Sequence, residues 1–268
     1  MNLTKLLPAI AEACRLSALR ARLESSREPL VLGVPDAAKA AVVAALIRDA
    51  ATPTLIVVPK PPQALALIEE LDAWLDGSVL HFPERDTLPY ERVPPDAETL
   101  RDRLQTLQAL AAGSTSVIVT SAVALAQRTL PLGTAANLEL RAGGRTTPDA
   151  LVTSLLQLGY RNAPVVTLPG ETARRGGIVD LFPATDAQPV RIEFLGDQIE
   201  SMRRFDAESQ RSSPPPGLET LTLGPALEAV DLPAAAATLA GQLDLSGCDS
   251  AVRERYEEEL EQLQAGEA

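Results

Sequence analysis

The chain has 268 residues, enough for one large domain or two modest domains with hydrophobic cores of their own. Its hydrophobic fraction of 46% is that of a globular protein, and 36 acidic against 24 basic residues give a formal net charge of −12. An acidic surface repels the phosphate backbone of nucleic acids, and one Trp, three Tyr and four Phe offer few platforms for base stacking. We therefore expect this chain to make no direct contact with nucleic acid.

Cysteine and histidine are too few for a Cys/His metal site, because the chain has two cysteines and one histidine. Cys14 lies in a helical pattern and is interpreted as a small buried apolar residue. His81 has no serine or cysteine nucleophile pattern beside it, so we assign it to packing and predict no catalytic residue. The N-terminus is amphipathic, and no apolar run reaches the roughly 18 residues of a membrane span. We expect a cytoplasmic protein that contacts no membrane and holds no metal or cofactor.

The first half of the chain alternates short apolar runs with helical patterns. Apolar residues three and four positions apart predict helices, and short apolar runs between turn residues predict strands. Strict alternation of strand and helix implies right-handed crossovers and a parallel sheet with helices on both faces. The fold predicted here is a doubly wound α/β domain. The predicted strands are 30–34, 54–58, 79–82 and 116–120, and the predicted helices are 16–23, 37–50, 65–75 and 96–110.

The segment from Gly33 to Ala40 stands between a predicted strand and a predicted helix, which is the setting of a phosphate-binding loop. Compared with the pattern G-x-x-x-x-G-K-[ST], it lacks the second glycine and the metal-binding hydroxyl. Pro35 removes a backbone N–H, and Asp36 puts a carboxylate where phosphate oxygens would lie, although it suits a helix cap. We predict that this loop binds no nucleotide and that the chain is not an enzyme. The degenerate loop comprises Gly33, Asp36, Ala38, Lys39 and Ala40.

The pattern changes near Pro131. Thr147-Pro148-Asp149 is a helix start, with a capping hydroxyl and a proline at the first helical position. Four extended runs follow, joined by short segments rich in Gly, Pro and Asp, which favours an antiparallel sheet over βαβ units. These runs are 164–168, 178–182, 190–195 and 199–205. Three phenylalanines among them are expected to form a small separate core: Phe182, Phe194 and Phe205.

Residues 212–217, with three consecutive prolines, are predicted to lead out of this region. The predicted division is thus a degenerate P-loop-like α/β domain at 1–131, a small inserted α+β domain with an antiparallel sheet at 132–212, and a linker at 213–268. The last segment would return to the α/β domain through a strand at 221–223 and two helices. The second helix is rich in glutamate and is interpreted as a solvated surface.

Residues 159–211 carry the most specific motifs of the chain. The motifs are Gly159-Tyr160-Arg161, GETARRGGIVDLFP at 170–183, VRIEFLGDQIES at 190–201, Phe205-Asp206 and Ser209-Gln210-Arg211. They resemble the segment that is shared by the UvrB excision-repair helicase and the transcription-repair coupling factor. Two upstream stretches, 83–91 and 101–104, resemble the coupling factor, and the whole resemblance spans about residues 25–230.

Two departures distinguish these family members. UvrB has a working phosphate loop, whereas the loop of this chain is degenerate. UvrB also has a long aromatic hairpin for gripping DNA between the equivalents of Tyr90 and Val117, where this chain has a loop and one leucine-lined helix. The resemblance therefore implies a fragment from the N-terminal, UvrB-like region of a coupling factor. RNA polymerase and DNA would be partners of the full-length protein through other domains.

The resemblance implies a non-catalytic adaptor whose inserted domain binds the UvrA damage-recognition protein. The residues that match the family's contact set are Arg175, Arg191 and Leu195, the last replacing a phenylalanine common at that position. Two guanidiniums beside an apolar side chain make a plausible binding hot spot. Residue chemistry alone favours another interpretation, in which Arg191 pairs with Glu193 or Asp197 across a strand and Arg175 serves the Arg-Gly-Gly turn. Two other functions stay open, a UvrB-type nucleotidase with an atypical loop and a structural or autoinhibitory domain.

Overall fold

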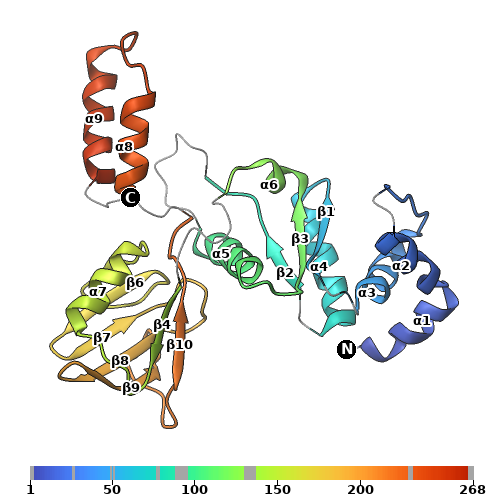
Figure 1. Cartoon of the computed structure of the whole chain (residues 1–268), viewed down its shortest axis with the longest axis horizontal. Coiled ribbons are helices and arrows are strands. Elements are labelled where there is room, and N and C mark those ends of the chain that lie inside the picture. Colours follow the sequence, from blue (N-terminus) through green and yellow to red (C-terminus); the bar gives the residue numbers. More distant parts are fainter. Residues whose placement is uncertain are drawn as a thin grey trace. The chain divides into compact units, whose positions relative to one another are not determined.

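The computed structural model describes residues 3–25, 28–48, 50, 52–76, 79–87, 96–129, 137–228 and 232–264. The chain divides into two compact units, Met1–Thr129 and Leu130–Ala268 (Figure 1). The first contains η1 (Thr4–Leu6), α1 (Leu7–Ala13), α2 (Leu16–Ser25), η2 (Asp36–Ala38), α3 (Lys39–Ile47), β1 (Thr54–Val58), α4 (Pro61–Leu75), β2 (Val79–Phe82), α5 (Ala97–Ala111), β3 (Val117–Ser121) and α6 (Ala122–Ala126). The second contains β4 (Leu138–Arg141), α7 (Pro148–Gln157), β5 (Arg161–Asn162), β6 (Glu171–Arg175), β7 (Ile178–Leu181), β8 (Val190–Leu195), β9 (Gln198–Arg204), β10 (Thr220–Leu223), α8 (Leu232–Gln242) and α9 (Ser250–Gln264).

The first unit is built on a parallel sheet whose described strands run in the order β1-β3-β2. The central strand β3 is buried at every position, and its alternate residues belong to different cores. Val119 packs in a cluster with Leu71 of α4 and Ala44 of α3. Ile118 packs on the other side with Phe82, and Leu107 of α5 lies against that cluster. Helices therefore cover both faces, and the predicted doubly wound α/β fold is confirmed.

Two predictions in this unit are wrong. Residues 30–34 are irregular rather than a strand, and Val31 is 96% exposed. An apolar run forms a strand only where a neighbouring strand takes up its backbone hydrogen bonds, and none of the described strands pairs with this segment. Cys14 is exposed rather than buried. It caps the end of α1, and the next residue, Arg15, has a positive φ of 52°, so Cys14 lies outside the buried face of the helix.

A buried arginine explains part of the upstream motif. The side chain of Arg103 is almost fully buried, donates to the carbonyl of Pro83 and lies over the ring of Phe82 at 4.2 Å from its centroid. These contacts join α5 to the end of β2, so the motif at 101–104 has a structural role. Residues 88–91 of the other upstream motif lie outside the described residues.

The second unit contains a sheet of strands in the order β5-β6-β7-β8-β9. The pairs from β6 to β9 are antiparallel, as predicted, and the short β5 pairs with β6 in parallel. Helix α7 starts at the predicted cap, where the Thr147 hydroxyl accepts from the N–H of Ala150 at 3.2 Å. It lies against β6 and β7 and buries Leu151 and Leu155 (Figure 1). The predicted α+β region with an antiparallel sheet is confirmed.

The predicted strand at 164–168 is wrong. The Glu171 carboxylate instead accepts hydrogen bonds from the N–H groups of Thr167 and Leu168, each at 2.9 Å, and holds this segment as a turn. The strand that borders β7 is β6, which starts at Glu171, seven residues after the predicted start at 164.

The expected phenylalanine core is confirmed in part. Phe182 and Phe205 pack with Val166 and Ala173. Phe194 is half-buried and is not a member of this cluster, because the alternation of β8 places it on the same face as the buried residues Val190 and Ile192.

The proline-rich stretch is held against the sheet. The N–H of Ser213 donates to the carbonyl of Arg204, and that of Leu218 to the carbonyl of Met202, each at 2.7 Å. Strand β10 then pairs with β4 in an antiparallel ribbon, with Thr220 opposite Arg141. Residues 220–223 therefore lie in the same unit as residues 138–141, and the three-domain division with an end at Ser212 stays a prediction.

Helices α8 and α9 pack against each other. No residue of α9 is buried among its described positions, in agreement with the interpretation of a solvated acidic helix. None of the helices in the described part of the chain is both long and apolar enough to cross a membrane.

Candidate partner-binding surface

Alternation along β6 sends two adjacent arginines to opposite faces of the five-stranded sheet. Arg174 pairs with Asp149 in the first turn of α7, so it lies on the face that this helix covers. Arg175 points to the other face, which we call the arginine face. By strand register and alternation the arginine face carries Arg175, Asp180, Arg191, Glu193, Leu195 and Arg203.

A buried carboxylate is the centre of the arginine face. Asp180 is 1% exposed and lies directly opposite Arg191 in the β7–β8 pair. Arg191 holds it with two parallel hydrogen bonds, Nε to Oδ1 at 2.7 Å and Nη2 to Oδ2 at 2.9 Å. Arg175 adds a third, from Nη2 to Oδ2 at 2.8 Å. One carboxylate thus joins two of the residues that the resemblance singled out.

Arg191 makes further contacts besides those with Asp180. Its Nη1 donates to the carbonyl of Gln210 at 3.2 Å and to the Ser212 hydroxyl at 3.3 Å. Its guanidinium lies 4.8 Å from the centroid of the buried Phe205 ring, and its side chain is 16% exposed. The hydrogen bonds to Asp180 raise the pKa of the Arg191 guanidinium above its ordinary value. The alternative interpretation expected Glu193 or Asp197 as its partner, and the structure shows Asp180 instead.

Arg175 and Leu195 are the exposed members of the arginine face. The side chain of Arg175 is 54% exposed, and Leu195 is 70% exposed. Both precede a hairpin turn with a positive-φ glycine, Gly176 and Gly196, and the two turns lie at the same end of the sheet, where the N–H of Phe194 donates to the carbonyl of Gly177 at 2.8 Å. The turn contact expected of Arg175 is made by Arg174, whose Nε donates to the Gly176 carbonyl at 3.2 Å.

A second ion pair lies on the arginine face. Arg203 Nη2 contacts both oxygens of Glu193, at 2.7 and 2.8 Å, and the Ser201 hydroxyl donates to the same carboxylate at 2.6 Å. The Ser201 hydrogen bond, followed by those of Arg203, holds the pKa of Glu193 below its ordinary value. Sequence reasoning assigned no part in the site to Asp180 and Arg203, and it placed Phe205 only in the core. The signal for Asp180 was a lone carboxylate within an apolar strand run, Ile178 to Phe182, where a buried charge requires partners.

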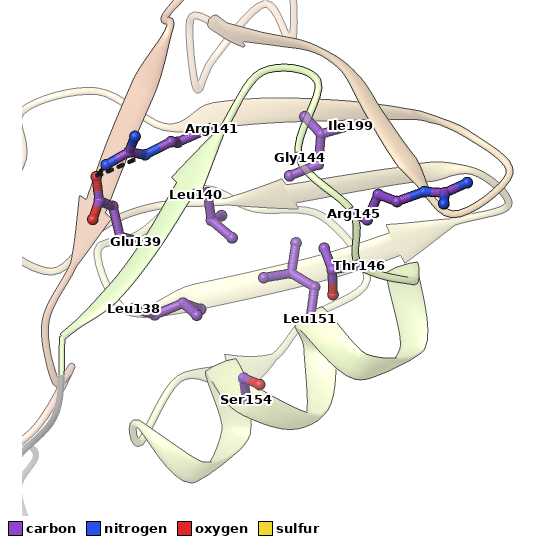
Figure 2. A pocket seen from close by; sticks show the side chains of 10 residues that line it. All are labelled: Leu138, Glu139, Leu140, Arg141, Gly144, Arg145, Thr146, Leu151, Ser154 and Ile199. Atoms are coloured by element: carbon purple, nitrogen blue, oxygen red, sulfur yellow. Dashed lines mark hydrogen bonds and ion pairs between the residues drawn. The ribbon is translucent and has the colours of Figure 1, made fainter.

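A separate cavity of about 330 Å³ lies between β4, α7 and the connection that joins them (Figure 2). Leu151 and Ser154 point into it from α7, and Leu140 points into it from β4 (Figure 2). Its polar groups already have partners, because Ser154 donates to the Ala150 carbonyl at 3.0 Å and Arg141 pairs with Glu139 at 2.7 Å. None of the predicted site residues lines this cavity.

Polar groups of the degenerate loop bind one another. The backbone N–H of Ala38 donates to the Pro35 carbonyl at 2.9 Å, and that of Lys39 to the Asp36 carbonyl, in the 3₁₀ turn η2. Lys39 Nζ pairs with the Asp36 carboxylate at 2.5 Å, and this contact lowers the pKa of Asp36. Asp36 therefore pairs with a lysine and makes no side-chain cap of the kind expected. These N–H groups and this ammonium are the ones that a phosphate loop would offer to a nucleotide.

The single histidine links β2 to α5. His81 Nδ1 lies 3.6 Å from an Asp102 carboxylate oxygen, and the His81 carbonyl accepts from the Thr106 hydroxyl at 2.8 Å. Among the described residues, no group of three or more His, Cys, Asp or Glu side chains is arranged to hold a metal ion.

Comparison with known proteins relates this geometry to a family. Residues 138–228, which begin at β4 and end just after β10, match the family model described as UvrB interaction domain. The chain is 31% identical over 217 residues to the transcription-repair-coupling factor of Bacillus subtilis, an alignment that covers 78% of this chain and 18% of that protein. The Escherichia coli factor is 33% identical over 192 residues, covering 71% of this chain and 17% of that protein. The Mycobacterium bovis factor is 37% identical over 202 residues, covering 72% and 16%. The chain spans less than a fifth of the length of these curated relatives, and the resemblance predicted from the motifs is confirmed.

Proposed function

We propose, because residues 138–228 have the sequence of a UvrB interaction domain, that this chain is an adaptor that docks the UvrA protein during transcription-coupled DNA repair. The observation that carries the proposal is the exposed pair Arg175 and Leu195 on a sheet face whose centre is the anchored Asp180–Arg191 pair. In a longer protein, RNA polymerase and DNA would be engaged through other domains.

The arginine face has the composition of a small binding hot spot. Arginine is enriched at such sites because its planar guanidinium recognises carboxylates with directed hydrogen bonds and also stacks on apolar groups. Arg175 offers this group at the surface, and Leu195 offers an exposed apolar side chain two strands away on the same face. The buried Asp180–Arg191 pair holds the surface in place, so a partner meets a preformed site.

The degenerate loop supports an adaptor that does no nucleotide chemistry. A phosphate loop works by presenting several free N–H groups and a lysine to the phosphates. Here the N–H groups of Ala38 and Lys39 and the Lys39 ammonium bind groups of the loop itself. This geometry favours recruitment over the alternative of an active UvrB-type nucleotidase.

Binding of purified UvrA to the full chain, measured by calorimetry or surface plasmon resonance, tests the proposal. We expect saturable binding that Arg175→Ala weakens by about tenfold, the effect of losing one hot-spot side chain. Arg174→Ala is the matched control, because it removes the neighbouring guanidinium from the opposite face and should leave the affinity within about twofold of wild type. Absence of binding by the wild-type chain would refute the function, and equal losses in the two variants would move the site elsewhere.

A further inference from the structure

The carboxylate of Asp180 contacts both arginines of the proposed contact set, yet it is itself almost inaccessible to a partner. We infer that Asp180 is the positioning residue of the docking surface: it fixes Arg191 from below and orients the exposed Arg175 toward the partner. This inference rests on the proposed function, because it concerns how the same surface is prepared for UvrA.

Folding alone gives little reason for a carboxylate at this position. Moving a charge out of water is unfavourable, and interactions with its partners offset this only when their geometry is good. Replacing a buried ion pair with apolar residues is therefore often neutral or stabilising. On the face where Asp180 lies, its cross-strand neighbour Ala173 is buried and apolar, and Phe182, two residues further along the chain, packs with Ala173. An apolar residue would therefore suit the strand, whereas the carboxylate suits the two guanidiniums.

The geometry divides the work between the two oxygens of Asp180. Oδ1 accepts from Arg191 alone, while Oδ2 accepts from both Arg191 and Arg175. Arg191 is also stacked on Phe205 and hydrogen-bonded to Gln210, so its position is fixed. Arg191 in turn fixes the Asp180 carboxylate, whose Oδ2 faces Arg175. The long side chain of Arg175 is held by one hydrogen bond, from its Nη2 to Asp180 Oδ2.

The remaining donors of Arg175 define the chemistry of the partner. In the described contacts Arg175 uses Nη2 alone, its side chain is 54% exposed, and its cross-strand neighbour on this face is the apolar Ile178 of β7. A guanidinium fork beside an apolar side chain fits a carboxylate that is flanked by an apolar residue. The arginine face also has three guanidiniums, of Arg175, Arg191 and Arg203, against the two carboxylates of Asp180 and Glu193, which favours an acidic segment on UvrA.

Orienting Arg175 before binding should raise the affinity of the chain for UvrA. Immobilising one flexible side chain on association weakens binding by about two- to twelvefold, and a side chain that is already held avoids this loss. Without Asp180, both arginines would sample other rotamers and repel each other. We therefore expect Asp180→Asn and Asp180→Glu to weaken UvrA binding by about tenfold while the chain stays folded.

A double-mutant cycle distinguishes positioning from a general structural role. We compare UvrA binding by the full chain carrying no change, Asp180→Asn, Arg175→Ala, or both. If Asp180 acts through Arg175, Asp180→Asn should weaken binding about tenfold in the wild-type background and no more than about threefold in the Arg175→Ala background. Asp149→Asn is the matched control, because it breaks the Arg174–Asp149 ion pair on the opposite face of the sheet and should leave the affinity within about twofold of wild type.

The NMR signals of the arginine Nε–H groups report directly whether Asp180 holds Arg191 in the free chain. In the free wild-type chain the Arg191 signal should be separate from those of exposed arginines, and in Asp180→Asn it should move among them. Thermal melts show whether each variant is folded, and Asp180→Glu retains the charge should Asp180→Asn unfold. The same loss in both backgrounds, or full affinity in a folded Asp180 variant, would overturn this inference alone. Absence of UvrA binding by the wild-type chain would instead overturn the proposed function.

Discussion

The two arginines of the candidate surface should differ sharply in their effect on stability. Arg191→Ala removes two of the three hydrogen bonds that hold the buried Asp180 carboxylate, together with the stacking contact on Phe205. Removing one partner of a buried ion pair costs about 3 to 5 kcal/mol, and a lost cation–π contact adds about 0.5 to 1 kcal/mol. Because Arg175 remains on Oδ2, we expect a net loss of about 3 kcal/mol for Arg191→Ala.

Arg175→Ala leaves the two-pronged Arg191 contact intact and removes a side chain that is 54% exposed. Exposed ion pairs contribute about 0 to 1 kcal/mol, so the loss should not exceed about 1 kcal/mol. Amide hydrogen exchange of β7 and β8 under native conditions measures both losses in the unit concerned. Fluorescence of Trp74, in α4 of the first unit, gives an internal control that should not change. Equal losses, or a larger one for Arg175→Ala, would refute the assignment of Arg191 as the structural member of the pair.

Three further predictions concern the docking surface and the degenerate loop. Leu195→Phe, which restores the family's aromatic residue, should raise UvrA affinity by about two- to fivefold, and Leu195→Ala should lower it, as measured by calorimetry. The pKa of Glu193 is lowered from its ordinary value of 4.5, so its stabilising effect is present above that pH and lost as the pH falls through the lower folded-state pKa. The melting temperature of wild type should therefore fall more steeply than that of Glu193→Gln below this value, and parallel pH profiles would contradict the assignment. Equilibrium titration with ATP should show no saturable binding in the micromolar range, whereas such binding would restore the nucleotidase alternative.

Among the predicted strands, the correct ones lie beside another strand, and the two wrong ones pair with none of the described strands. The runs at 54–58 and 190–195 match β1 and β8, and both strands lie beside a partner in the sheet. The runs at 30–34 and 164–168 are as apolar, but neither pairs with a described strand. Local composition records how well a residue suits a strand, whereas pairing depends on segments far away in the chain.

The candidate site was likewise predicted only in part from the sequence. The motifs identified Arg175, Arg191 and Leu195, but not the carboxylate that connects the first two. Asp180 is opposite Arg191 only because β7 and β8 pair in one register, and a shift by one residue would turn it to the other face. The strand that contains Arg174 and Arg175 was itself missed, so their opposite orientations could not be predicted from the sequence.

The buried members of the arginine face stabilise the fold, whereas its exposed members are free to be substituted. Arg191 and Asp180 are constrained by packing, since each is nearly enclosed and hydrogen-bonded to more than one neighbour. Arg175 and Leu195 carry few internal contacts, so a substitution there costs little stability and acts mainly on binding. The phenylalanine that the motif resemblance implies at the position of Leu195 would fall at one of these unconstrained positions. We therefore expect substitutions of the exposed residues to change the proposed affinity for UvrA, while the central pair keeps these residues in place.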